Sequence, residues 1–372
     1  MLRAPTSQPV SCPERSLAGS LGRTLERHMD HSVPATSKHL VAEGSGSASR
    51  GAVKAKKAAK QPAAAKSPTK ANLALVPQVA SAAAFADASL RNSAFYADDN
   101  VIILNMDVRD AMAALSKAGV IVNCMATSPP FYGQRDYGVD GQIGLEEHPS
   151  KFIESLVECF EACRPVLAEN GSLWVNLGDT YWSGKGEHRS GESKQSARRF
   201  GIRPQDKTGD GKLCKPKQLL LIPHRFAIAM QDKDWVVRND NVWVKPNPIP
   251  DQVRDRCSVS HEYVFHLVKS RWYFFDKKAV GRKSDSGTTL PPSDTWKIAP
   301  ARSSHAHKAR FSEELIRIPV LSTTPPNGVV LDPFGGSGTT LTFARRHGFR
   351  AIGIDIKKEF CQLMVDSLTA LK

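Results

Sequence analysis

The sequence predicts a doubly wound α/β fold, in which helices cover both faces of a mostly parallel sheet. Two apolar runs, VIILN at 101–105 and VIVNCMAT at 120–127, have the length and β-branched content of buried strands. A helical stretch at 108–117 lies between them. Because strands and helices continue to alternate toward the C-terminus, the pattern favours a sheet built from βαβ units.

The remaining elements follow from the same periodicities. Apolar residues recur at spacings of four, four, three and four from Phe152 to Leu167, which predicts an amphipathic helix that Gly171 helps to end. Further helices are expected at 218–230, 311–321, 337–347 and from 357 onward. Further strands are expected at 172–177, 235–245, 261–269, 328–333 and 351–355.

The composition is that of a chain that can bury a large core. Of its 372 residues 41% are hydrophobic and 24% are charged, and no run approaches the roughly 18 apolar residues that a membrane span requires. An integral membrane protein is therefore excluded. Seven cysteines, an odd number without a CxxC pair, argue against a disulfide framework and a cysteine zinc site. They favour a reducing cytoplasm.

The net charge of +14 is concentrated in two segments. Residues 1–92 carry a net charge of +8 and residues 183–217 a net charge of +6, so the rest of the chain is near neutral. This distribution is typical of flexible arms that bind a phosphate backbone, with nucleic acid as the partner. In the basic insertion, residues 183–217, the candidate phosphate contacts are Arg198, Arg199 and Arg203. A solvated surface loop is the alternative.

The N-terminal tail, residues 1–94, is predicted to be disordered. Its centre at 44–70 is rich in Gly, Ser, Ala, Lys and Pro and has no acidic or aromatic side chain, so it cannot bury enough apolar surface to offset the entropy of ordering. A tail that only aids solubility is the alternative to a DNA-binding arm. Residues 1–28 weakly resemble an organelle transit peptide, and a true start at Met29 explains them equally well.

A glycine-rich turn, LDPFGGSGTT at 331–340, lies between an apolar strand and a helix. Glycines let a ligand approach the backbone closely, and the free amides of a helix start favour a carboxylate or phosphate. The spacing matches neither the GxGxxG of NAD sites nor the GxxxxGK of nucleoside triphosphate sites. Asp355 ends the following strand about 20 residues later, where an acid can accept both ribose hydroxyls. The alternative is an ordinary glycine-rich turn.

A second motif, TSPPF at 127–131, ends a buried strand. Two consecutive prolines cannot extend a sheet, so the chain must leave it in a fixed conformation with free carbonyls. The resulting rim offers a hydroxyl, a carbonyl and an aromatic face, which suit a planar base with an exocyclic amine. A simple strand terminator is the alternative.

Together the two motifs resemble those of the exocyclic-amine DNA methyltransferases of bacteria and phages, (S/D)PP(Y/F) and DPFxGxGTT. The resemblance extends over most of 95–372 and includes GSLWVNLGDTY at 171–181 and VWVKPNPIPDQVRDRCSVSHEYVF at 242–265. The catalytic motif precedes the cofactor motif, as in the circularly permuted beta group of that family. The resemblance implies a Rossmann-like, S-adenosylmethionine-dependent methyltransferase domain at 95–372, with a target-recognition segment at 277–305.

The resemblance also assigns roles to individual residues. Ser128, Pro129, Pro130 and Phe131 would hold the target base. Asp355 would bind the ribose, Asp107 would lie near the adenine, and Phe311 would close over the methionine end. The S-adenosylmethionine pocket would further be lined by Asp332, Phe334, Gly336, Ser337, Gly338 and Thr339.

The reaction implied is an in-line displacement at the sulfonium methyl by the exocyclic nitrogen of a flipped base in double-stranded DNA. Ser at the first motif position favours N4 of cytosine, with N6 of adenine as the alternative. Attack on a ring carbon of cytosine needs a cysteine nucleophile, and the chain has no Pro-Cys pair. A binding protein that has lost catalysis, and an RNA or protein methyltransferase, are the rival classes.

Three further expectations concern metals, DNA contacts and cellular context. His261, Glu262 and His266 depart from the HExxH zinc motif by one residue and lie in a predicted strand, so no metal site is expected. Lys245 either contacts DNA or finishes a strand. The family resemblance implies a partner restriction endonuclease and a cytoplasmic, nucleoid-associated protein.

Overall fold

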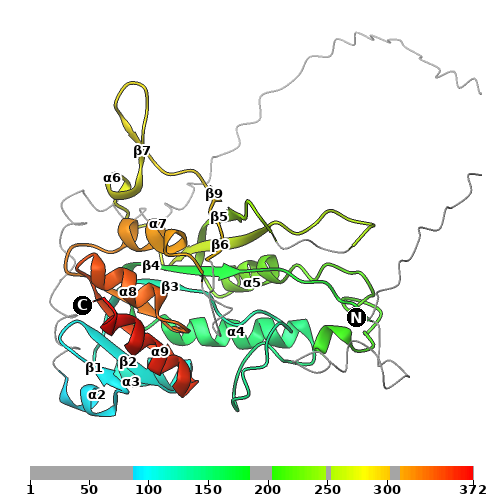
Figure 1. The fold of residues 1–372 in the computed structure, drawn as a ribbon, viewed down its shortest axis with the longest axis horizontal. Helices are drawn as coiled ribbons and strands as arrows, with labels where there is room; N and C mark the ends of the chain where they lie inside the picture. The colour runs from blue at the N-terminus through cyan, green and yellow to red at the C-terminus, as the bar shows by residue number, and fades with distance from the viewer. Residues whose placement is uncertain (1–86, 185–202, 249–252, 302–310, 372) are drawn as a thin grey trace, which may run out of the picture. The chain divides into compact units, whose positions relative to one another are not determined.

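The computed structural model describes residues 87–184, 203–248, 253–301 and 311–371 (Figure 1). The expectations for residues 1–86, for the tail's function and for Arg198 and Arg199 lie outside the described residues.

Within these ranges nine strands form one sheet in the order β1-β2-β11-β10-β3-β4-β6-β5-β9. Five neighbours, from β2 to β4, are parallel, whereas β6 runs antiparallel to both β4 and β5. The doubly wound, mostly parallel sheet predicted from the sequence is therefore confirmed. The strands are β1 (Tyr96–Ala97), β2 (Val101–Asn105), β3 (Val122–Thr127), β4 (Leu167–Leu177), β5 (Val236–Val244), β6 (His261–Val268), β9 (Thr295–Lys297), β10 (Val329–Asp332) and β11 (Arg350–Asp355).

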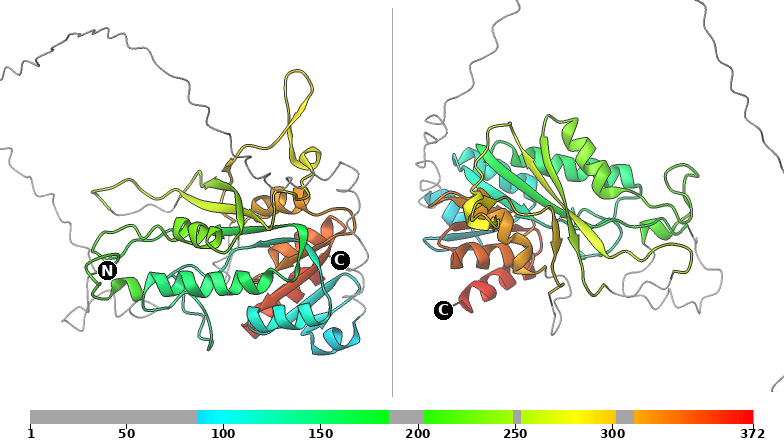
Figure 2. Two further views of the ribbon diagram at one scale, coloured as in Figure 1. Left: turned by 180° about the vertical axis from the view of Figure 1, so that it is seen from behind. Right: turned by 90° about the horizontal axis from the view of Figure 1, so that it is seen from above.

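Helices cover the sheet on both faces (Figure 2). One layer holds α3 (Val108–Lys117), α4 (Pro149–Cys163) and α5 (Ile222–Gln231), and the other holds α7 (Glu313–Thr323), α8 (Thr339–Arg346) and α9 (Lys358–Thr369). Among the helices of the described ranges, none has both the length and the apolar character needed to cross a bilayer.

The two-sided burial explains why the central strands are mostly apolar on both of their faces. Successive side chains of a strand point to opposite faces. In β2, Ile102 and Leu104 pack into the core beneath α3 and α4, whereas Val101 and Ile103 pack into the core beneath α8 and α9. Each strand therefore needs a continuous apolar run, and that is the pattern seen at 101–105.

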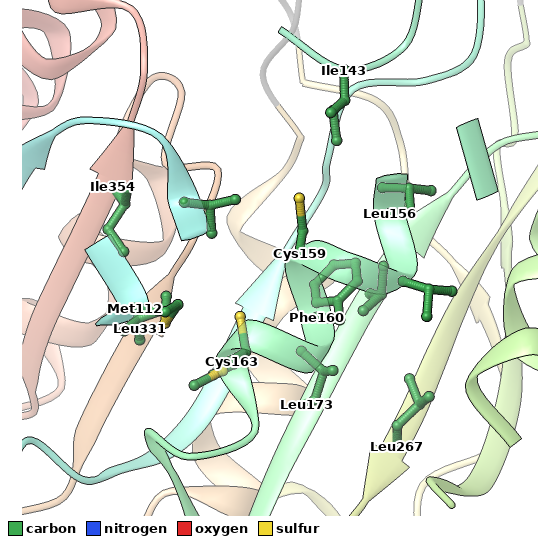
Figure 3. Packing of buried hydrophobic residues seen from close by; sticks show 14 of the residues in the cluster. Met112, Ile143, Leu156, Cys159, Phe160, Cys163, Leu173, Leu267, Leu331 and Ile354 are labelled. Carbon is green, nitrogen blue, oxygen red and sulfur yellow. The ribbon is translucent and has the colours of Figure 1, made fainter. Parts of the chain in front are cut away.

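The core under α4 includes Phe160 and Leu331, the first residue of the glycine-rich motif (Figure 3). The ring of Phe160 is fully buried and lies 5.4 Å from the ring of Phe226 and 6.1 Å from that of Phe334, measured between ring centroids. Burial of one such side chain contributes roughly 1.5–3 kcal/mol. Packing of Phe160 thus fixes one end of the turn that follows β10. Cys159 and Cys163 are also in this core.

The ordered domain begins before residue 95, where the sequence analysis placed its start. Helix α2 (Ala88–Ser93) is capped by Asp87, whose Oδ1 accepts the Leu90 amide at 2.7 Å, and Leu90 is buried in the core. The expectation of disorder up to residue 94 was therefore wrong for this helix. Six residues with one buried apolar side chain give too short a periodic signal to predict a helix.

The described half of the basic insertion is folded onto the domain. The short helix η2 (Pro204–Asp206) buries Gln205, whose Nε2 donates to the Gly133 carbonyl at 3.1 Å. Arg203 forms two hydrogen bonds, at 2.9 and 3.0 Å, with the buried carboxylate of Asp206. Residues 203–217 are thus anchored by their own polar side chains and differ from the flexible arm expected there.

The predicted target-recognition segment is described up to residue 301. It contains α6 (Lys277–Val280), a hairpin of β7 (Arg282–Lys283) and β8 (Thr289–Leu290), and strand β9, which pairs in parallel with β5. The hairpin projects from the body above α7 (Figure 1). Part of this segment therefore completes the sheet and part extends away from it.

Candidate active site

The candidate site lies at the carboxyl ends of β10 and β3. These adjacent parallel strands lead to helices on opposite faces, and such a reversal point opens a crevice in doubly wound sheets. A cavity of about 650 Å³ opens there, within the range of about 300–1,000 Å³ usual for ligand pockets. It is lined by both sequence motifs, although they are separated by about 200 residues.

The glycine-rich turn that follows β10 forms one wall. Gly336 and Gly338 have φ angles of 51° and 79°, in the left-handed region that L side chains rarely adopt. The buried carboxylate of Asp332 holds the turn, since its Oδ1 accepts the Phe334 amide at 3.1 Å and its Oδ2 accepts the Thr340 hydroxyl at 2.7 Å. Asp332 therefore shapes the turn from inside the protein.

Asp355 ends the neighbouring strand β11 and faces the cavity. Its Oδ2 accepts the Gly336 amide at 3.0 Å and its Oδ1 accepts the Lys357 amide at 2.9 Å. Burial raises the pKa of Asp355 to about 6, against the opposing effect of these two amides. Each carboxylate oxygen keeps acceptor capacity for a further donor, such as a ribose hydroxyl.

Asp107 and Phe311 line the same cavity. Asp107 caps α3, and its hydrogen bond with the Arg109 guanidinium, at 2.8 Å, holds the pKa of its carboxyl below the usual range. Phe311 directly precedes Ser312, whose hydroxyl caps α7. The structure thus brings together residues that are more than 200 positions apart in the chain.

The motif TSPPF leaves β3 and contributes a second part of the cavity wall. Ser128, Pro129, Pro130 and Phe131 all line the cavity. Gly178 makes room for the Phe131 ring, because a Cβ at that position would lie 2.7 Å from Phe131 Cε2. The end of β4 therefore determines where this ring can lie.

The predicted cofactor residues divide into two groups. Six line the cavity: Asp107, Phe311, Phe334, Gly336, Ser337 and Asp355. Three lie behind its surface: Asp332, Gly338 and Thr339. Gly338 and Thr339 begin α8 and, like Asp332, determine the shape of the turn.

Two further cavity residues, Asn176 and Glu262, were missed by the sequence analysis. Asn176 is at the end of β4 and Glu262 at the start of β6, and the two strands are paired. The Ser128 hydroxyl donates to Asn176 Oδ1 at 3.0 Å, and Asn176 Nδ2 donates to Glu262 Oε2 at 3.1 Å. The sequence signal for both residues was a polar side chain within a predicted apolar strand. Such a side chain needs a hydrogen-bonding partner when the strand is buried.

The candidate DNA contacts in the described ranges are engaged in ion pairs. Lys245 lines the cavity and pairs with Glu262. Arg203 pairs with Asp206. Neither side chain is therefore a freely extended cation of the kind that the charge pattern suggested.

Cys159 also lines the cavity, next to Asp107 and Val108. Burial raises the pKa of its thiol to about 12, so it remains protonated at neutral pH. Since the thiolate is the nucleophilic form, Cys159 is not activated for covalent attack on a base.

His148, Asp210 and Cys214 form a cluster whose potential ligand atoms lie within 4.8 Å of one another. His148 Nδ1 accepts the Ser150 amide at 3.2 Å, so the ring proton resides on Nε2, which lies 3.2 Å from Asp210 Oδ2. Neither ring nitrogen then has a lone pair for a metal. This cluster is better explained as a cap of α4.

The residues of the HExxH-like stretch also have other partners. They lie in strand β6, as predicted, and His266 is buried against Trp174, with its Nε2 2.9 Å from the Ser172 hydroxyl.

The fold and this cavity define a Rossmann-like methyltransferase. A family model described as DNA methylase matches residues 122–366, well over half of the chain, and the chain belongs to this N6/N4 DNA methylase family. It is 41% identical over 247 residues to the type II methyltransferase M.Cfr9I of Citrobacter freundii, covering 66% of this chain and 81% of that protein. It is 37% identical over 260 residues to the type II methyltransferase M.SmaI of Serratia marcescens, covering 69% and 87%.

A solved structure supports the same fold. The structure of the PvuII DNA methyltransferase, described as cytosine-N4-specific, aligns with a TM-score of 0.53 at 19% identity and covers 72% of this chain and 86% of that one. At this identity the likeness concerns the fold alone.

Proposed function

We propose that this protein transfers a methyl group from S-adenosylmethionine to N4 of a cytosine flipped out of double-stranded DNA at a specific site. The observation that carries the proposal is that one cavity is lined by the glycine-rich turn, by Asp355 and by the Ser128–Phe131 rim. A cofactor wall and a base wall thus face a common space, as a direct transfer between two bound molecules requires.

The residues of the cofactor wall suit the proposed group. S-adenosylmethionine, when bound, supplies an electrophilic methyl on a sulfonium. Asp355 would accept the ribose hydroxyls, the turn at Gly336 and Ser337 would approach the amino-acid portion, and Phe311 would cover it. The carboxylates of Asp107 and Asp355 also make this wall favourable for a cationic ligand.

The residues of the base wall address the weak nucleophilicity of the exocyclic nitrogen, whose lone pair is delocalised into the ring. Hydrogen bonds from its protons to the Ser128 oxygen and the Pro129 carbonyl would favour a tetrahedral nitrogen with a localised lone pair. Phe131 would stack on the ring and hold it in line with the methyl. Cytosine is favoured over adenine because Ser, and not Asp, occupies the first motif position.

DNA binding would involve segments outside the two walls. We assign contacts with the DNA backbone to the basic insertion at 183–217 and target recognition to 277–305, in which Pro300 and Ala301 line the cavity. In line with its type II relatives, a restriction endonuclease for the same site is the proposed companion.

Expression in a host without DNA methylation tests the proposal. The host DNA is hydrolysed to nucleosides and analysed by mass spectrometry, with a Ser128→Ala variant as the matched control. We expect N4-methylcytosine with the wild-type protein and almost none with the variant. Detection of N6-methyladenine instead would show that the target base is adenine. Unmodified DNA would refute the catalytic function.

A further inference from the structure

A chain of polar contacts runs from the base wall into the sheet. Ser128 Oγ donates to Asn176 Oδ1 at 3.0 Å, Asn176 Nδ2 donates to Glu262 Oε2 at 3.1 Å, and Glu262 Oε1 accepts from Lys245 Nζ. These residues come from the end of β3, from β4, from β6 and from the end of β5. All four line the cavity.

The orientation of the Asn176 amide is fixed by its surroundings. Its Nδ2 faces two groups that can only accept, the Glu262 carboxylate and the Tyr263 carbonyl, both at 3.1 Å. Asn176 is only 5% exposed, so a flipped amide would direct its oxygen at two other oxygens without water to screen them. Oδ1 must therefore face Ser128.

This orientation decides the polarity of the Ser128 hydroxyl. A serine hydroxyl has one proton and two lone pairs. Because Asn176 Oδ1 can only accept, the Ser128 proton points into the protein and the lone pairs remain for a donor in the cavity. An exocyclic amine presents protons, so this is the polarity that its recognition requires.

We propose that Asn176 and Glu262 are positioning residues that set Ser128 as a hydrogen-bond acceptor toward the exocyclic amine. The proposal rests on the function proposed above and names the residues on which it depends. Glu262 orients the Asn176 amide, and this amide orients the Ser128 hydroxyl. Of the three, only the hydroxyl would contact the base.

Lys245 completes this arrangement. Its side chain is 24% exposed and that of Glu262 is 14% exposed, so their charges are partly withdrawn from water. The ammonium holds one carboxylate oxygen of Glu262 and leaves the other for Asn176. Lys245, which the sequence analysis considered as a DNA contact, is assigned here to the support of Glu262.

A double-mutant cycle tests the proposal. The rate of a single turnover is measured with saturating cofactor and DNA for wild type, Glu262→Ala, Ser128→Ala and the double variant. We expect Glu262→Ala to lower the rate about 10- to 100-fold, since misdirecting one hydrogen bond costs about 1.4–2.7 kcal/mol. If Glu262 acts only through Ser128, the double variant should match Ser128→Ala within about twofold.

Controls separate positioning from a general structural effect. Glu169→Ala removes a carboxylate of β4 that pairs with Lys269 and is 88% exposed, and it should leave the rate unchanged. Cofactor affinity should be equal in all variants.

A rescue variant covers the case in which Glu262→Ala does not fold. Glu262→Gln leaves one carbonyl oxygen for two donors, whereas Glu262→Gln with Lys245→Met frees that oxygen for Asn176. We expect the combined change to be at least about fivefold faster than Glu262→Gln alone, because the Ser128 polarity is restored.

Two outcomes would overturn the assignment while the wild type is active. The first is a double variant whose rate is reduced by the product of the two single-variant factors, those of Glu262→Ala and Ser128→Ala. The second is a Glu262→Gln variant whose rate is not increased by adding Lys245→Met. An inactive wild type would instead refute the proposed function itself, so the two failures are distinguishable.

Discussion

Cofactor binding is expected to depend on pH through Asp355. Burial raises the pKa of this carboxyl to about 6, and the nearby Asp332 adds to the effect. Ribose hydroxyls donate more strongly to an ionised carboxylate than to a protonated one. Bound S-adenosylmethionine therefore favours deprotonated Asp355. Its affinity is highest above the pKa of Asp355 and decreases as the pH falls through that value.

The magnitude follows from the ionised fraction. With a pKa of about 6, about half of the free protein is competent at pH 6 and about one part in eleven at pH 5. The apparent Kd should then rise about twofold at pH 6 and about tenfold at pH 5, relative to pH 7. The α-amino group of the ligand titrates near pH 8, so the range from pH 5 to 7 isolates the carboxyl.

Isothermal titration calorimetry at half-unit pH intervals measures this effect. Asp355→Asn should weaken binding at pH 7 by about 1.5–3 kcal/mol and abolish the pH dependence. Asp107→Asn is the matched control, because the pKa of Asp107 is held below its usual range by Arg109 and its charge stays constant from pH 5 to 7. A wild-type Kd that is constant over this range, or a pH dependence that persists in Asp355→Asn, would refute the reasoning.

Three further predictions address the base wall and the DNA contacts. Gly178→Ala would place a Cβ 2.7 Å from the Phe131 ring, so kcat should fall at least about tenfold while S-adenosylmethionine affinity, measured by calorimetry, is unchanged. Ser128→Ala should abolish most methyl transfer in a tritium-transfer assay with unaltered cofactor binding, and near-normal turnover would contradict the role of its hydroxyl. Replacing Arg198 and Arg199 with Ala should reduce the slope of log affinity against log salt by up to about 2 in fluorescence anisotropy, whereas an unaltered slope would indicate a solvated loop.

The order of the elements could be predicted from the sequence because the signals are local. The central strands are mostly apolar since both of their faces are buried, and each long helix repeats its apolar residues every three or four positions. The strands at 101–105 and 351–355 and the helix at 108–117 were predicted within one residue of their observed bounds. Short elements such as α2 and β9 depend on contacts with the completed domain and were missed.

The two motifs were also predictable, because their backbone requirements restrict the residue types. Paired prolines end β3, and left-handed φ angles at Gly336 and Gly338 form the turn after β10. What each acidic residue does was less predictable. Asp332 is part of the glycine-rich motif, and Asp355 ends the neighbouring strand β11. Asp332 supports the turn from inside the protein, whereas Asp355 faces the cavity.

Only the tertiary structure decided which distant side chains act together. Strand order in the sheet places β3 beside β10 and β4 beside β6, and this order is set by the packing of both helix layers and not by any local pattern. Asn176 and Glu262 therefore meet behind Ser128 although 86 residues separate them. The sequence by itself determined the walls of the site, whereas the polarity of its serine depends on buried hydrogen bonds across strands, which exist only in the folded sheet.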